Sequence, residues 1–121
     1  MIKIIPTPTL IQAAGTPAKQ IAEFIGKANT ATDTVSIAHM KSPEGWSEPG
    51  QTPEFEEYSI VLKGVLKAAT RTASHEATAG QAVIAPAGEW VQYSTPYPGG
   101  AEYLAICVPA FSPERAHRDK G

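Results

Sequence analysis

From residue 34 onward, apolar and polar residues alternate along most of the chain. Val35, Ile37 and His39 fall on one face of the first alternating segment, residues 34–40. A period of two is typical of a strand with one buried face. Similar short segments follow at residues 58–62, 65–72, 81–85, 90–94 and 102–108. Glycine- and proline-rich turns separate them, so the pattern predicts an all-β sandwich or barrel.

The first thirty residues carry a different pattern. Residues 2–5 predict a short strand, since they are mostly isoleucine. Thr16 is a suitable helix N-cap, and Pro17 suits the first helical position. Apolar residues then recur with the i, i+3, i+4 spacing of one helical face, at Ile21, Phe24 and Ile25. We therefore expect one short N-terminal α-helix ahead of the strands.

The length of 121 residues fits a single domain. We divide it into an N-terminal strand and helix (residues 1–33), a barrel (residues 34–110) and a tail (residues 111–121).

The composition of the chain limits which partners and which cellular location we expect. The net charge of −2 offers no basic face for phosphate backbones, so nucleic acid is not an expected partner. No apolar stretch is long enough to span a membrane, and the N-terminal apolar run ends at Pro6, unlike a secretory signal. Cys107 is the single cysteine, which fits a reducing compartment. We expect a cytoplasmic protein without a membrane partner.

Residues 45–64 resemble the first signature block of the cupin superfamily, G-x5-H-x-H-x3-E-x6-G. Gly45 and Gly64 match the two glycines, and Glu57 matches the glutamate. Gln51 and Pro53 stand where that block has its two histidines.

Residues 80–95 resemble the second cupin block, G-x5-P-x-G-x2-H-x3-N. Gly80, Pro86 and Gly88 match, whereas Val91 and Thr95 replace the histidine and the asparagine. The resemblance implies a small, single-domain, RmlC-like cupin: an antiparallel jelly-roll barrel whose turns are built on the glycines and prolines of the two blocks. The acidic pair before V-L-K-G is also similar to cupins of ethanolamine-utilisation operons.

The resemblance implies a metal site that this chain has mostly lost. Family members hold a transition metal with imidazoles and a carboxylate, and such metals favour nitrogen donors. Of the residues at the ligand positions, only Glu57 and the weak amide oxygen of Gln51 can coordinate. We therefore expect no metal and no cofactor.

His39 and Glu57 are the candidate catalytic residues. The alternation allows His39 to face the same cavity as Glu57, where a carboxylate would orient the imidazole and raise its pKa. A buried Glu57 either meets a partner such as His39, Gln51 or a tyrosine, or its own pKa rises. The remaining candidates are ligand-binding residues: Gln51, Tyr93, Val91 and Trp46.

These residues favour a small-molecule-binding cupin, with proton transfer by His39 or Glu57 as the reaction of an isomerase, lyase or cyclase acting on a small polar acid or sugar-like ligand. Two alternatives stay open: a degenerate metal-dependent enzyme that uses His39 and Glu57, and a non-catalytic sensor or assembly protein. Small cupins commonly form homodimers, and residues 2–5 offer an edge for such a contact.

Overall fold

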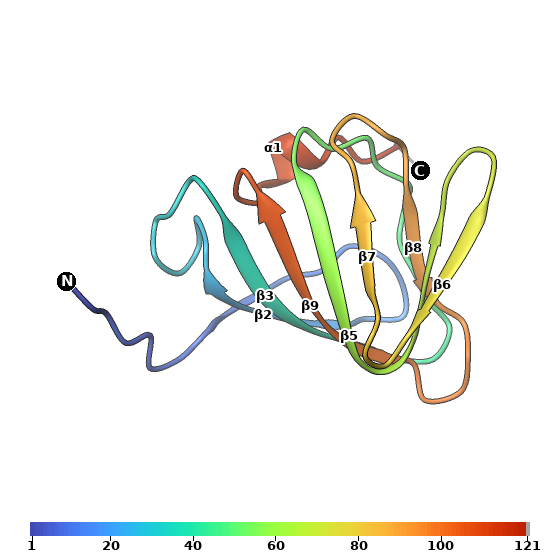
Figure 1. Ribbon diagram of the computed structural model, residues 1–121, viewed down its shortest axis with the longest axis horizontal. Coiled ribbons are helices and arrows are strands. Elements are labelled where there is room, and N and C mark those ends of the chain that lie inside the picture. Colours follow the sequence, from blue (N-terminus) through green and yellow to red (C-terminus); the bar gives the residue numbers. More distant parts are fainter. Residues whose placement is uncertain (121) are drawn as a thin grey trace.

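The computed structural model describes residues 1–120 and is built almost entirely of antiparallel strands. A single turn of helix, α1, follows the last strand (Figure 1). The elements in chain order are β1 (Thr9–Ile11), β2 (Gln20–Ile25), β3 (Ser36–Ser42), β4 (Trp46–Ser47), β5 (Glu56–Ala69), β6 (Ser74–Thr78), β7 (Ala82–Ala85), β8 (Gln92–Thr95), β9 (Ala101–Val108) and α1 (Pro113–Ala116).

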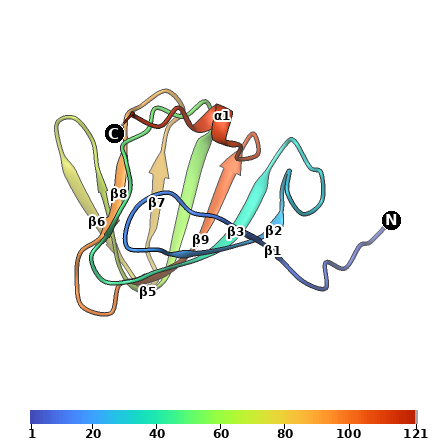
Figure 2. The same ribbon diagram turned by 180° about the vertical axis from the view of Figure 1, so that it is seen from behind.

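The long strand β5 joins the two halves of the sheet. Its first half pairs with β9 and β7, and its second half pairs with β6 and β8. The strand path runs β1-β2-β3-β9-β5-β8-β4. The sheet therefore curls around one side, as Figures 1 and 2 show, and its concave face encloses the interior that we call the cup.

Gly64 allows β5 to pass from one half to the other. Its φ of +74° is in the left-handed region that side chains disfavour. An added Cβ at this position would lie 2.0 Å from the Gly100 carbonyl oxygen. The close approach of the two backbones explains why a glycine stands here, although it lies within a continuous strand and not at the predicted turn between strands.

Two groups of buried side chains fill the interior. The larger lies between the two halves of the sheet and includes Trp46, Val61 and Leu66. The smaller joins Phe55 of the β4–β5 loop to Cys107 of β9 and Ala116 of α1. Cys107 is a buried free cysteine, and the cup lies against this smaller group.

The all-β jelly-roll prediction is confirmed, but the N-terminal helix was wrong. Residues 20–25 form strand β2, which pairs with β1 and β3. Thr16 is not an N-cap, because its backbone exchanges two hydrogen bonds of 3.0 Å with Ser47. The predicted strand at residues 2–5 is also absent, and the first strand begins at Thr9. The β-structure thus starts well before the predicted boundary at residue 34.

Among residues 1–120, no helix is both long enough and apolar enough to cross a membrane.

Candidate functional site: a cup lined by buried charges

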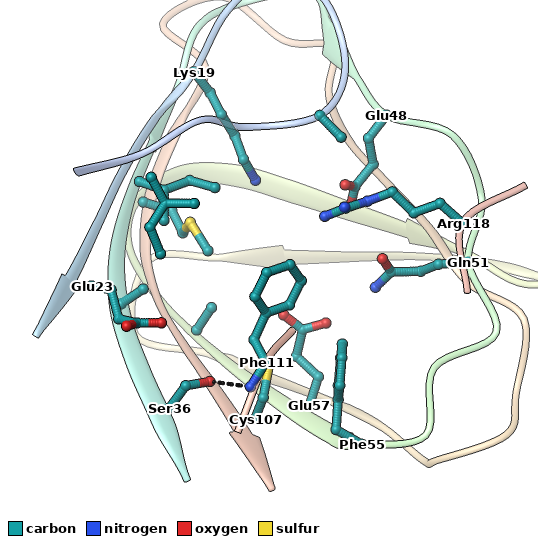
Figure 3. Close-up of a pocket in the computed structure, with 16 residues that line it drawn as sticks. Lys19, Glu23, Ser36, Glu48, Gln51, Phe55, Glu57, Cys107, Phe111 and Arg118 are labelled. Carbon is teal, nitrogen blue, oxygen red and sulfur yellow. Dashed lines mark hydrogen bonds between the residues drawn. The ribbon is translucent and has the colours of Figure 1, made fainter. Parts of the chain in front are cut away.

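The cup contains a partly open cavity of about 50 Å3. Strands β2, β3, β5 and β9 supply its floor and walls with inward side chains that include Ile21, Ala38 and Ala105. The segment before β2 passes across the concave side of the sheet in Figure 2, and Lys19 reaches inward from it (Figure 3). Phe111 and Arg118 close the cavity from the C-terminal segment.

Glu57 is the acid at the base of the cup. It lies on β5 opposite Cys107 of β9, and both residues line the cavity. The residue keeps some exposed surface, yet its Oε1 is buried without a hydrogen-bond partner within residues 1–120. Burial, then the nearby Glu48 carboxylate, raise the pKa of Glu57 to about 7, while Lys19 opposes the shift. The carboxyl can therefore accept or donate a proton near neutral pH.

Lys19 enters from the opposite side. Its ammonium lies 3.9 Å from the centroid of the Trp46 ring and 3.2 Å from the Tyr103 hydroxyl. Desolvation lowers the pKa of Lys19, and the Glu48 and Glu57 carboxylates oppose that shift. The two aromatic residues hold the side chain in place, because a cation is attracted to the face of an indole ring.

Arg118 and Glu48 complete the charged lining. The Nε of Arg118 is buried and has no hydrogen-bond partner among the described residues, and its guanidinium lies 5.3 Å from the Phe111 ring centroid. Glu48 is 8% exposed, and burial raises its pKa although Lys19 and Arg118 oppose the shift. Backbone pairing of Gln51 with Arg118 places the guanidinium at the cup.

Glu23 also lines the cup, but its charge is already satisfied. It is 2% exposed, and its Oε2 accepts hydrogen bonds from the backbone amides of Ala28 (2.9 Å) and Asn29 (3.1 Å). This carboxylate therefore orders the β2–β3 loop.

His39 does not join Glu57, which corrects the predicted catalytic pair. The inward residues of β3 line the cup at Ser36, Ala38 and Met40. His39 lies between them in sequence and so projects from the outer face. There its Nε2 is 3.2 Å from the Glu102 carboxylate.

Of the four predicted ligand-binding residues, Gln51 lines the cavity. The other three, Tyr93, Val91 and Trp46, belong to the larger buried group. Tyr93 is buried, its hydroxyl has no hydrogen-bond partner within residues 1–120, and burial raises its pKa far above the usual range. Val91 packs in the core and exchanges backbone hydrogen bonds with Gln51. Trp46 is fully buried and donates to the Ala14 carbonyl, so it supports Lys19 and is not exposed to a ligand.

Sequence reasoning missed Lys19, Glu48 and Arg118. Lys19 fell within the wrongly predicted helix, Glu48 within a loop, and Arg118 within the tail. No spacing rule connects three residues so far apart along the chain; the tertiary fold alone brings them together.

A family-type metal centre does not fit the residues in the cup. Within residues 1–120, no group of three or more histidine, cysteine, aspartate or glutamate side chains could hold a metal ion. The residues at two of the histidine positions are poor ligands, because Val91 is an apolar core residue and Gln51 offers one amide oxygen.

Comparison with known structures identifies the fold. No family model matches the chain. The polyketide cyclase RemF from Streptomyces resistomycificus superposes with a TM-score of 0.74 at 19% identity, covering 100% of this chain and 88% of RemF. An RmlC-like cupin family protein from Methanocaldococcus jannaschii has a TM-score of 0.69 at 17% identity, covering 91% and 94% of the two chains. The Clostridium difficile EutQ protein has a TM-score of 0.65 at 18% identity, covering 80% and 72%. The chain is a cupin by fold and resembles EutQ.

One curated relative bears on function. The chain is 44% identical over 101 residues to a Myxococcus xanthus protein named Endoribonuclease YbeY. The match covers 84% of this chain and 34% of the relative, so the chain spans about a third of that protein's length. This finding overturns the prediction of a small-molecule cupin with isomerase, lyase or cyclase activity. That prediction also relied on a His39–Glu57 pair, which the fold separates.

Proposed function

We propose that this chain serves RNA cleavage as a cupin domain that works together with a separate RNA-cleaving domain. The extent of the match to the endoribonuclease supports this proposal: it takes in most of this chain and leaves two thirds of the relative outside the match. Domains of 100 to 150 residues are typical, so the unmatched part has room for a cleaving domain of its own.

The dimensions of the cup favour this division of labour. A cavity of about 50 Å3 lies well below the roughly 300 Å3 at which pockets for drug-sized ligands begin. RNA also needs a positively charged surface along its backbone, and this chain carries a net charge of −2. We therefore propose that the other domain contacts the RNA. This agrees with the expectation that the present chain binds neither nucleic acid nor a membrane.

The test compares three proteins on one structured RNA transcript: this chain, the Myxococcus relative, and the relative without its matched third. We expect no cleavage by this chain. The shortened relative should still cleave, but more slowly or at other positions, because it lacks the cupin domain. Circular dichroism of the shortened relative shows whether the remaining part is folded.

Two outcomes would refute the proposal. Cleavage by this chain, lost on the substitution Glu57→Gln, would place the active site in the cup. An unchanged rate and an unchanged cleavage pattern in the folded, shortened relative would separate the cupin domain from RNA cleavage.

We also propose that the chain is a cytoplasmic homodimer that associates through the outer face of its sheet. Four strands, β3, β9, β5 and β7, place one apolar row on this face: Ile37, Ile106, Tyr58 and Ile84. Ile60 and Ile84 remain 39% and 66% exposed. An exposed apolar face of this kind suits a second copy of the same chain, since a two-fold axis pairs identical patches.

A further inference from the structure

We propose that the cup binds a phosphate group between the Lys19 ammonium and the Arg118 guanidinium. This inference does not depend on a role in RNA cleavage, because it follows from the lining of the cavity alone.

Two cations converge on the cavity from opposite ends of the chain. Lys19 precedes β2, and Arg118 follows α1 (Figure 3). They are close enough that Arg118 contributes to lowering the pKa of Lys19 by like-charge repulsion. Two cations held together at a cavity form a site for an anion.

The fold holds both cations in position. Lys19 lies over the Trp46 ring, while the backbone around Arg118 pairs with the segment before β5: Asp119 N donates to the Gly50 carbonyl (2.8 Å) and Thr52 N to the His117 carbonyl (3.2 Å). The Trp90 indole fixes the end of this segment by donating to Asp119 Oδ2 at 2.8 Å. Pre-positioned donors lower the entropic cost of binding a ligand.

Some charged groups in the cup lack hydrogen-bond or ion-pair partners. Across residues 1–120, no ion pair within 4.0 Å links Lys19 or Arg118 to Glu48 or Glu57. Arg118 Nε and Glu57 Oε1 are buried without partners in the same residues. Buried polar groups are costly unless they are hydrogen-bonded, so an occupant must supply both acceptors and donors.

A phosphate group meets these requirements. Its oxygens accept from Lys19 and Arg118, and a protonated P–OH can donate to a carboxylate of Glu48 or Glu57. Its five heavy atoms suit a cavity of about 50 Å3, since a cavity needs only roughly 10–15 Å3 to hold one water. Sulfate has the same shape, but it carries no proton near neutral pH and meets only the cationic half of the site.

Isothermal titration of the protein with sodium phosphate and with sodium sulfate tests the site. We expect binding of phosphate in a one-to-one ratio, at least tenfold tighter than that of sulfate. Arg118→Gln and Lys19→Met should each weaken phosphate binding at least tenfold. Arg71→Gln is the matched control, because Arg71 also stacks on an indole, 4.1 Å from the Trp90 ring centroid, but does not line the cup.

The same titration with a 5′-phosphorylated dinucleotide separates free phosphate from an RNA end. We expect the cup to take free phosphate and to reject the dinucleotide, and binding of both would show that a terminal phosphate enters. Thermal unfolding confirms that each variant is folded. No binding of phosphate, or equal binding by the folded Arg118→Gln and Lys19→Met variants, would overturn the proposal and leave water as the occupant of the cup.

Discussion

Glu57 shows how the fold changes the chemistry of one residue. The cupin resemblance placed this glutamate inward, and the structure confirms that it lines the cup. Its partner could not be predicted, because a one-residue difference in strand phase decides which face His39 occupies. The outcome is an acid that lacks the predicted imidazole and has a pKa near 7.

Burial of Glu57 should make stability depend on pH. Its pKa is 4.5 in the unfolded chain and about 7 in the folded protein, so between these values the folded state binds more protons. The free energy of unfolding should therefore fall as pH rises from 4.5 to 7, by about 2–3 kcal/mol from this group. Glu57→Gln should flatten the fall in part, since Glu48 shifts in the same direction.

Urea unfolding at several pH values measures this effect. Glu44→Gln, a substitution on the exposed surface, serves as the control and should follow the wild-type curve. A wild-type stability that rises with pH across this window would contradict a buried carboxyl at position 57.

Substitutions at two glycines can distinguish the cost of a steric clash from the cost of backbone strain. Gly64 and Gly80 have similar φ values of +74° and +88°, but a Cβ at Gly64 would lie 2.0 Å from the Gly100 carbonyl oxygen and one at Gly80 would meet nothing within 4 Å. We expect Gly80→Ala to cost about 1 kcal/mol and Gly64→Ala about 3 kcal/mol or more. Chemical denaturation of both variants measures the difference, and equal costs would refute the close approach.

At the scale of elements, the segment at residues 20–25 shows where sequence patterns fail. Three apolar residues fit a helical face, yet the segment pairs with β1 and β3 as a strand. Six residues are too few for helix propensity to compete with hydrogen bonding to two neighbouring strands. Most strands after residue 34 were predictable because they alternate clearly between glycine or proline turns. The pattern nevertheless divided β5 into residues 58–62 and 65–72, whereas the strand continues through Gly64, and it missed β6.

The C-terminal segment packs against the barrel as a structural element. Phe111 contacts Phe55 with ring centroids 5.9 Å apart, and its backbone amide donates to Ser36 Oγ at 2.9 Å. Arg115 pairs with Asp33 at 3.0 Å. The prediction of a tail at residues 111–121 therefore understated its role in closing the cup.

Phe111→Ala should destabilise the protein by about 2–3 kcal/mol, since it removes a partly buried ring that covers the cavity. Phe24→Ala makes the same chemical change on the outer face, where Phe24 is 37% exposed, and should cost less than about 1 kcal/mol. Urea denaturation compares the two variants. Equal losses would show that the C-terminal segment does not support the cup.

At the scale of the whole molecule, the outer face of the sheet predicts the mode of association. Ile84→Lys places a charge on the apolar face and should convert the proposed homodimer to a monomer. Ile4→Lys makes the same change in the N-terminal segment, at a residue 81% exposed, and should leave the dimer intact. Sedimentation equilibrium measures both masses, and dissociation by Ile4→Lys alone would assign the contact to the N-terminal segment.

The fold was predictable from the sequence, whereas the function was not. Two motif blocks were enough to identify the jelly roll, because their glycines and prolines shape its turns whatever the barrel contains. The charged lining of the cup comes from Lys19, Glu48 and Arg118, which no local pattern connects. The relative that bears on function is matched by this chain over only about a third of its length.

The most direct test of a charged cup is the titration of the Glu57 side chain by carbon-13 NMR. The carboxyl carbon, assigned by comparison with Glu57→Gln, should titrate with a pKa of about 7. A pKa near 4.5, the value of a solvated glutamate, would show that this carboxyl is in bulk water and that the cup does not close around it.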